Sequence, residues 1–199
     1  MINKNSLINF FEALNNKSKE FYDEFNSLDG QLGDGDLGIT ISKGVSEIYN
    51  NKNNFDEDVG KIFLLCAKLF TKVSSSSFGT LTAISFLVLG KEYKGKKEIK
   101  NIDILSGLQK IMEAISIRGK SNLGDKTILD SINEIINSIK LSTEKDLGYL
   151  TYEACQIALI KFKGRECKIG RARMFAEKSK ELNDPGMFAF SKLSLIFIK

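Results

Sequence analysis

Histidine and tryptophan are absent from this chain, and proline occurs once, at Pro185. Without an imidazole, no residue can serve as a histidine base, nucleophile, phosphocarrier or metal ligand. This absence excludes Ser-His-Asp and Cys-His catalysis and histidine-based zinc sites. Because proline is so rare, long helices can run without interruption.

Cysteines and long apolar runs are scarce too. The three cysteines form no CxxC pair, and their odd number indicates reduced thiols and a cytoplasmic protein. No apolar run approaches the roughly 18 residues of a membrane-spanning helix. The net charge of +4 is mild, and basic residues are scattered apart from a cluster over residues 91–100. We therefore expect neither a membrane nor a nucleic acid as a partner.

What the chain does contain is helical periodicity along most of its length. Apolar residues recur at the spacing of an amphipathic helix in eight segments. These segments are residues 5–25, 38–50, 57–73, 78–89, 102–117, 128–139, 147–163 and 188–198. No alternating strand pattern or hairpin signal is evident, and residues 164–183 are polar and less regular. The sequence predicts one all-α domain over residues 1–199, a bundle or barrel of about eight antiparallel helices in up-down order.

The stretch from Leu28 to Gly38 holds three aspartates and four glycines. Asp29, Asp34 and Asp36 would repel one another if held close without a counterion. Carboxylates clustered on a permissive loop suit a hard cation such as Mg²⁺, which often completes its shell with phosphates and water. The alternative is a solvated acidic turn, because glycine and aspartate are ordinary turn residues.

Other unusual loops fall at the same end of an up-down bundle as residues 29–38. Ser74 to Ser77 precedes an apolar helix, where hydroxyls and free N–H groups can bind an anion or simply cap the helix. Cations occur around Gly119 and at Lys126, next to Thr127. Arginines at 171 and 173 can bind phosphate, although a solvated loop is the alternative for Arg173. Together these loops predict a magnesium-nucleotide site.

Four segments, in order, resemble the ADP-binding L subunit of dihydroxyacetone kinase, which is also the C-terminal domain of single-chain forms. They are Leu28-Asp29 with Gly33-Asp34-Gly35-Asp36-Leu37-Gly38, Val73 to Thr80, Arg118 to Thr127, and Gly170-Arg171-Ala172 with Asp184-Pro185-Gly186. The resemblance covers essentially the whole chain. It implies an all-α barrel of eight antiparallel helices, in agreement with the periodicity.

The resemblance also implies roles for individual residues. The three aspartates Asp29, Asp34 and Asp36 match the ligands of two Mg²⁺ that bridge the phosphates of ADP or ATP. Arg171 matches a nucleotide contact that offsets charge on the transferring phosphoryl group. The full set of implied nucleotide-binding positions is Leu37, Gly38, Thr40, Ser76, Ser77, Gly119, Ile128, Arg171, Asp184, Pro185 and Gly186.

Two departures from the family pattern stand out. Leu37 replaces a histidine that commonly follows the second aspartate of the Asp-x-Asp pair. Serines at 74–77 replace a loop that is usually rich in glycine. Both departures indicate a divergent branch, which can differ in nucleotide affinity, phosphoryl donor or ketose.

The resemblance implies a phosphotransferase that is inactive alone. In the family, a separate K subunit holds dihydroxyacetone or another short ketose through a covalent bond to histidine, and this chain has no histidine. The phosphoryl donor is either ATP or a phosphotransferase-system protein, and a homodimer is a further open possibility. One alternative is a non-catalytic ADP-binding regulator or coactivator of the same fold. The other is a structural helical bundle with a chance acidic loop.

Overall fold

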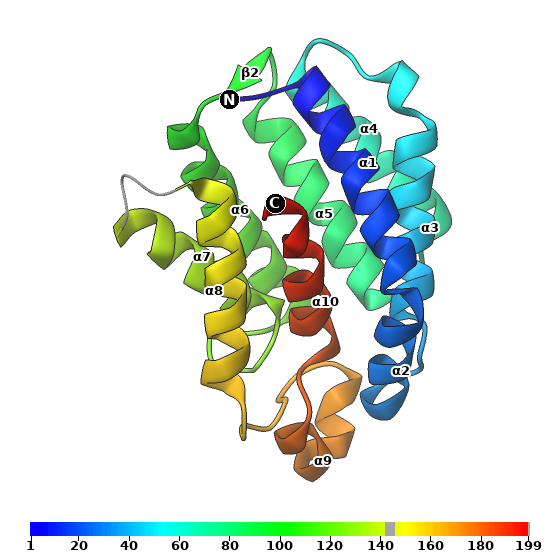
Figure 1. Ribbon diagram of the computed structural model, residues 1–199, viewed down its shortest axis with the longest axis vertical. Helices are drawn as coiled ribbons and strands as arrows, with labels where there is room; N and C mark the ends of the chain where they lie inside the picture. The colour runs from blue at the N-terminus through cyan, green and yellow to red at the C-terminus, as the bar shows by residue number, and fades with distance from the viewer. Residues whose placement is uncertain (142–145, 199) are drawn as a thin grey trace. The chain divides into compact units, whose positions relative to one another are not determined.

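The computed structural model describes residues 1–141 and 146–198. Over these residues the chain forms ten α-helices, three 3₁₀ helices and one pair of two-residue strands (Figure 1). The prediction of an all-α fold is confirmed. None of the described helices is both long and apolar enough to cross a lipid bilayer.

The chain divides into two compact units. The first consists of Met1–Glu20 and Ile39–Ile115, and the second of Phe21–Gly38 and Ser116–Lys199. The prediction of a single domain over residues 1–199 therefore stays a prediction.

The first unit is organised around aromatic side chains. The buried ring of Phe11 lies 6.0 Å from that of Phe55 and 6.1 Å from that of Phe86. Helices α4 and α5 pack side by side, and Ser76 caps the N-terminus of α5. The elements are β1 (Ile2–Asn3), α1 (Lys4–Glu20), α3 (Leu37–Asn50), η1 (Lys52–Asn54), α4 (Val59–Val73), α5 (Ser77–Glu92), β2 (Glu98–Ile99) and α6 (Asn101–Gly119). Strands β1 and β2 pair antiparallel, while α3 and α6 each run partly into the second unit.

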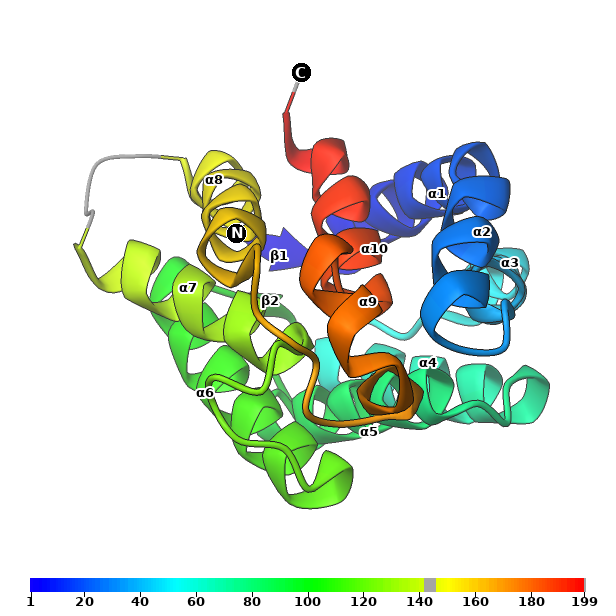
Figure 2. The same ribbon diagram turned by 90° about the horizontal axis from the view of Figure 1, so that it is seen from below.

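The second unit is built on α8, which packs against α7 and α10 (Figure 2). Helix α2 contacts α10, where the ring of Phe25 meets that of Phe188 edge-on at 6.4 Å. The elements are α2 (Tyr22–Leu32), α7 (Ile128–Leu141), α8 (Leu147–Phe162), η2 (Arg171–Phe175), α9 (Ala176–Glu181), α10 (Pro185–Leu193) and η3 (Ser194–Phe197).

Three boundaries differ from the sequence prediction. The helix expected over residues 5–25 is two helices separated at Phe21, and the second continues to Leu32. Asp29 is therefore helical rather than part of a loop. Residues 176–181, expected to be irregular, form α9. Helix α10 begins at Pro185, where Asp184 caps it and proline suits a first helical turn, but it ends at Leu193 and is followed by η3 instead of continuing to residue 198.

Candidate functional site

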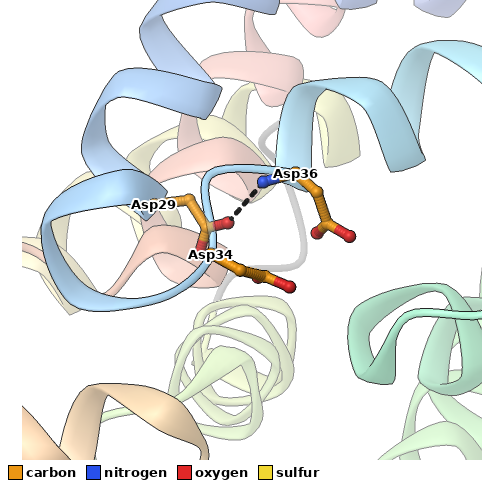
Figure 3. Close-up of side chains that lie close together, drawn as sticks. All are labelled: Asp29, Asp34 and Asp36. Atoms are coloured by element: carbon orange, nitrogen blue, oxygen red, sulfur yellow. Dashed lines mark hydrogen bonds between the residues drawn. The ribbon is translucent and has the colours of Figure 1, made fainter.

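The three aspartates of the 28–38 stretch converge. Asp29 projects from the last turn of α2, whereas Asp34 and Asp36 lie in the connection of residues 33–36, Asp36 directly before α3 (Figure 3). One carboxylate oxygen from each lies within 4.8 Å of one from each of the others. The three carboxylates therefore lie together, and their role as Mg²⁺ ligands stays a prediction.

Asp29 also stabilises the backbone of residues 33–36, which connect α2 to α3. Its Oδ2 accepts hydrogen bonds from the backbone N–H of Asp36 at 2.9 Å and of Leu37 at 3.3 Å. These N–H groups belong to the start of α3, where backbone donors lack helical partners and an anionic acceptor is favourable. One oxygen of Asp29 thus organises the backbone while its other oxygen, Oδ1, lies against Gly33.

Asn26 completes this arrangement, and the sequence prediction missed it. Its Oδ1 accepts the N–H of Gly38 at 2.7 Å. A Cβ at Gly38 would press against the carbonyl oxygen of Tyr22 and lie 2.8 Å from the same Asn26 oxygen. Only glycine therefore fits where α3 meets α2. The sequence signal that could have found Asn26 is its place one turn before Asp29 on the same helix face.

Arg171 supplies positive charge to the cluster. Its guanidinium forms an ion pair with the carboxylate of Asp34. Gly170, in the left-handed region at φ 70°, turns the backbone directly before η2, in which Arg171 is the first residue. Both side chains are about half exposed, so solvent screens their attraction and the pair contributes little stability. The structure thus brings together two residues that the resemblance assigned to separate roles.

The donor set fits a hard divalent cation. Mg²⁺ binds oxygen ligands at about 2.0–2.1 Å in octahedral geometry, so its ligand oxygens lie about 3 to 4 Å apart. The ligand oxygens of the three carboxylates all lie within 4.8 Å of one another, which is close to this range. Asp34 is exposed. Asp29 and Asp36 are only partly exposed.

Two predicted residues of the first unit contact each other. The hydroxyl of Thr40 donates to that of Ser76 at 3.0 Å, and Ser76 Oγ accepts the N–H of Gly79 at 3.0 Å as the cap of α5. Ser77 is the first, exposed residue of that helix. The capping role is therefore present, and a phosphate-binding role for these residues stays a prediction.

Further predicted nucleotide contacts occupy helix ends in the second unit. Gly119 ends α6 and Ile128 begins α7, and both are half-buried. Asp184 caps α10 by accepting the N–H of Met187 at 2.9 Å. Removal from water raises the pKa of the Asp184 carboxyl to about 6. The nucleotide-binding roles of these positions, of Pro185 and Gly186, and of the buried Leu37 stay predictions.

Lys126 lies elsewhere than the sequence analysis expected. The sequence pattern places it among the cations available to a nucleotide, whereas in the structure Lys126 is 1% exposed. Its ammonium donates to three backbone carbonyls instead of facing solvent. A sequence pattern cannot reveal this, because the three carbonyls come from the irregular segment that follows α8.

Comparison with known proteins links this geometry to a family. The family model of the DAK2 domain matches residues 31–197. The fold is shared with a dihydroxyacetone kinase of C. freundii in its native form, with a TM-score of 0.73 at 18% identity. The same is true of that kinase in complex with AMP-PNP and Mg²⁺, with a TM-score of 0.72 at 20% identity. Both matches cover 95% of this chain and 33% or 32% of the kinase chain, about a third of its length. A search of curated protein sequences found no match.

Proposed function

Because the chain belongs to the DAK2 domain family, we propose that it is the nucleotide-binding subunit or domain of a kinase for dihydroxyacetone or another short ketose. In this proposal it binds ADP or ATP together with Mg²⁺. The C. freundii kinase of the same fold has been solved with AMP-PNP and Mg²⁺, which supports the choice of ligand. The carboxylate cluster of Asp29, Asp34 and Asp36 is the observation that carries the proposal.

The residues of the second unit suit phosphoryl transfer. The three carboxylates would hold two Mg²⁺, which neutralise phosphate charge when bound. Arg171, already beside Asp34, would stabilise charge on the transferring group, as phosphoryl transfer generally requires. Arg171 is therefore the residue of this chain that we assign to catalysis.

The ketose is proposed to bind elsewhere. The chain spans about a third of the kinase chains that share its fold, which supports a separate K-type subunit or domain as the partner that holds the substrate. The absence of histidine agrees with this division, because the covalent attachment of the ketose known in the family needs an imidazole. Either ATP or a phosphotransferase-system protein can supply the phosphoryl group in this scheme.

The test is calorimetric titration of ADP into the protein with and without Mg²⁺. We expect binding that requires Mg²⁺ and is lost in Asp34→Asn. Asp23→Asn, which removes an exposed carboxylate near the start of the same helix as Asp29, is the matched control and should bind as wild type. No binding by the wild-type protein at millimolar ADP and Mg²⁺ would sink the proposal.

A second candidate is a non-catalytic regulator that keeps bound ADP. The burial of Leu37 favours it, because this side chain stands where the family commonly has a histidine and is 5% exposed. Kinase activity on addition of a K-type subunit distinguishes the two. Activity supports the kinase, whereas ADP binding without activity, with every K-type partner tried, supports the regulator.

A further inference from the structure

Lys126 is a buried cation whose hydrogen bonds are fully satisfied by the main chain. Its Nζ donates to the carbonyl oxygens of Arg165 at 2.8 Å, Ser179 at 2.6 Å and Leu182 at 2.7 Å. An ammonium has three N–H donors, so each proton has one acceptor. Burial lowers the pKa of the Lys126 ammonium, and a buried charge is tolerated only when it is hydrogen-bonded in this way.

The three carbonyls share one origin. All belong to the segment between α8 and α10, residues 163–184, which contains only η2 and the six-residue α9. Within it, Cys167, Ala172 and Leu182 pack with Leu32 of α2. A segment with so little regular structure needs other links to hold a single conformation.

The position of the carbonyls along the segment matters for the site. Arg165 precedes Arg171, whereas Ser179 and Leu182 follow it. The ammonium therefore fastens both ends of the stretch that carries the guanidinium beside Asp34. Two further bonds close the same stretch, from Cys167 N to Ser179 Oγ at 2.8 Å and from Gly164 N to the carbonyl of Lys180 at 3.1 Å.

Lys126 is itself held firmly. Its backbone lies in the left-handed region at φ 62°. Residues on either side of it are hydrogen-bonded to Asp130. The carboxylate of Asp130 accepts the N–H of Gly124 at 2.7 Å and of Thr127 at 2.9 Å. The carbonyl of Asp125 accepts the N–H of Lys168 at 3.1 Å, a further link to the segment.

We propose that Lys126 is a positioning residue that fixes residues 163–184 and thereby places the Arg171 guanidinium beside the carboxylate cluster. The effect on ligand binding rests on the proposed function, whereas the effect on the segment does not. The purely structural alternative is that Lys126 supports the whole second unit without any particular effect on Arg171.

The first test is hydrogen–deuterium exchange of the ligand-free protein. In Lys126→Met we expect faster exchange over residues 163–184, with α7 and α8 as protected as in the wild type. Lys178→Met, which removes an exposed lysine from α9, should leave the pattern unchanged. Unchanged exchange over 163–184 in Lys126→Met overturns the inference. Loss of the cooperative unfolding transition also overturns it, because Lys126 would then support the whole unit.

The second test is a double-mutant cycle on Mg²⁺-dependent ADP binding. A charge-assisted contact to phosphate accounts for about tenfold or more in affinity, so Arg171→Gln should weaken binding by about that factor. If Lys126 acts through Arg171, Lys126→Met should have a similar effect and the double variant should be no weaker than Arg171→Gln. Additive losses, which mark independent sites, would show that Lys126 acts by another route.

Chemical rescue completes the design. Lys126→Ala removes a group with the shape of n-propylammonium from a space lined by three carbonyls. Added n-propylammonium should restore ADP binding, and 1-propanol, which lacks the charge, should not. Equal effects of the two additives would count against the inference. If the wild-type protein binds no ADP, the proposed function fails while the exchange experiment still decides the role of Lys126.

Discussion

Asp29 combines two tasks in one side chain, and they can be separated. Its Oδ2 accepts two backbone N–H groups at the start of α3, and the carboxylate as a whole contributes charge to the cluster with Asp34 and Asp36. Hydrogen bonding needs only an oxygen acceptor, whereas binding a divalent cation depends on the negative charge. A substitution of Asp29 that removes only the negative charge should therefore affect stability less than one that removes both the charge and the oxygen acceptor.

We predict that Asp29→Asn retains most of the stability of the wild type but loses affinity for Mg²⁺. The amide oxygen can still accept the N–H groups of Asp36 and Leu37. Asp29→Ala should lose both properties, with a decrease in the free energy of unfolding on the order of 1–3 kcal/mol for the unpaired backbone donors. Urea denaturation and titration with Mg²⁺ or Mn²⁺ measure the two effects.

The outcome that contradicts this division is equal stability of the two variants. The N–H groups of α3 would then be satisfied by water, and Asp29 would serve the cation alone. Asp23→Asn on the same helix serves again as the control for removing one negative charge.

At the scale of elements, the site depends on the close contact of Gly38 with the N-terminal half of α2. The backbone of Gly38 lies against the Tyr22 carbonyl and the Asn26 side chain. This contact fixes the backbone of the second unit at Gly38, and Asp36 stands directly before Leu37, the first residue of α3. Elsewhere in α2, Gly30 has more room, since a Cβ there would meet only the Cα of Gly35 at 3.7 Å.

The two glycines therefore give opposite predictions for the same substitution. Gly38→Ala should destabilise the protein by roughly 2–4 kcal/mol, because the new methyl group overlaps the backbone of α2. Gly30→Ala should stabilise it by about 0.5–1 kcal/mol, because alanine is favoured over glycine inside a helix. Denaturant unfolding of both variants checks this, and a stable Gly38→Ala protein would show that α3 can shift without cost.

The same elements show what sequence reasoning can reach. Helical periodicity located the long helices because their apolar faces repeat within the segment itself. The aspartate cluster was equally visible because its members lie within eight residues of one another. The separation of α1 from α2 at Phe21 was not, since the apolar pattern continues through that residue without a glycine or proline. The burial of Lys126 was not visible either, because the three carbonyls that it contacts lie in a segment without a periodic pattern.

At the scale of the whole molecule, the absence of histidine means that other groups must determine how stability changes with pH near neutrality. In most proteins imidazoles dominate the change in charge between pH 5 and 8, and this chain has none. A carboxyl with a raised pKa can take that place. Asp184 is such a group, because removal from water raises its pKa from 3.8 to about 6 while it caps α10.

The raised pKa of Asp184 decides whether the free energy of unfolding rises or falls with pH. The ionised carboxylate is less favourable in the folded protein than in the unfolded chain, so the free energy of unfolding decreases as pH rises from about 4 to about 6 and then levels off. Asp184→Asn keeps an oxygen that can cap α10 but cannot ionise. Its stability relative to wild type should therefore increase between pH 4.5 and pH 8, on the order of 1–2 kcal/mol after allowance for partial exposure.

Urea unfolding of both proteins at several pH values measures this difference. Asp146→Asn is the matched control, because Asp146 caps α8 through a solvent-exposed bond to Tyr149 N at 3.0 Å. It shows what the amide substitution does at an exposed cap. A stability difference for Asp184→Asn that stays constant from pH 4.5 to 8 would mean that the folded protein solvates this carboxylate as well as water does. In that case solvent reaches the Asp184 carboxylate, and a polar ligand such as a nucleotide could reach it too.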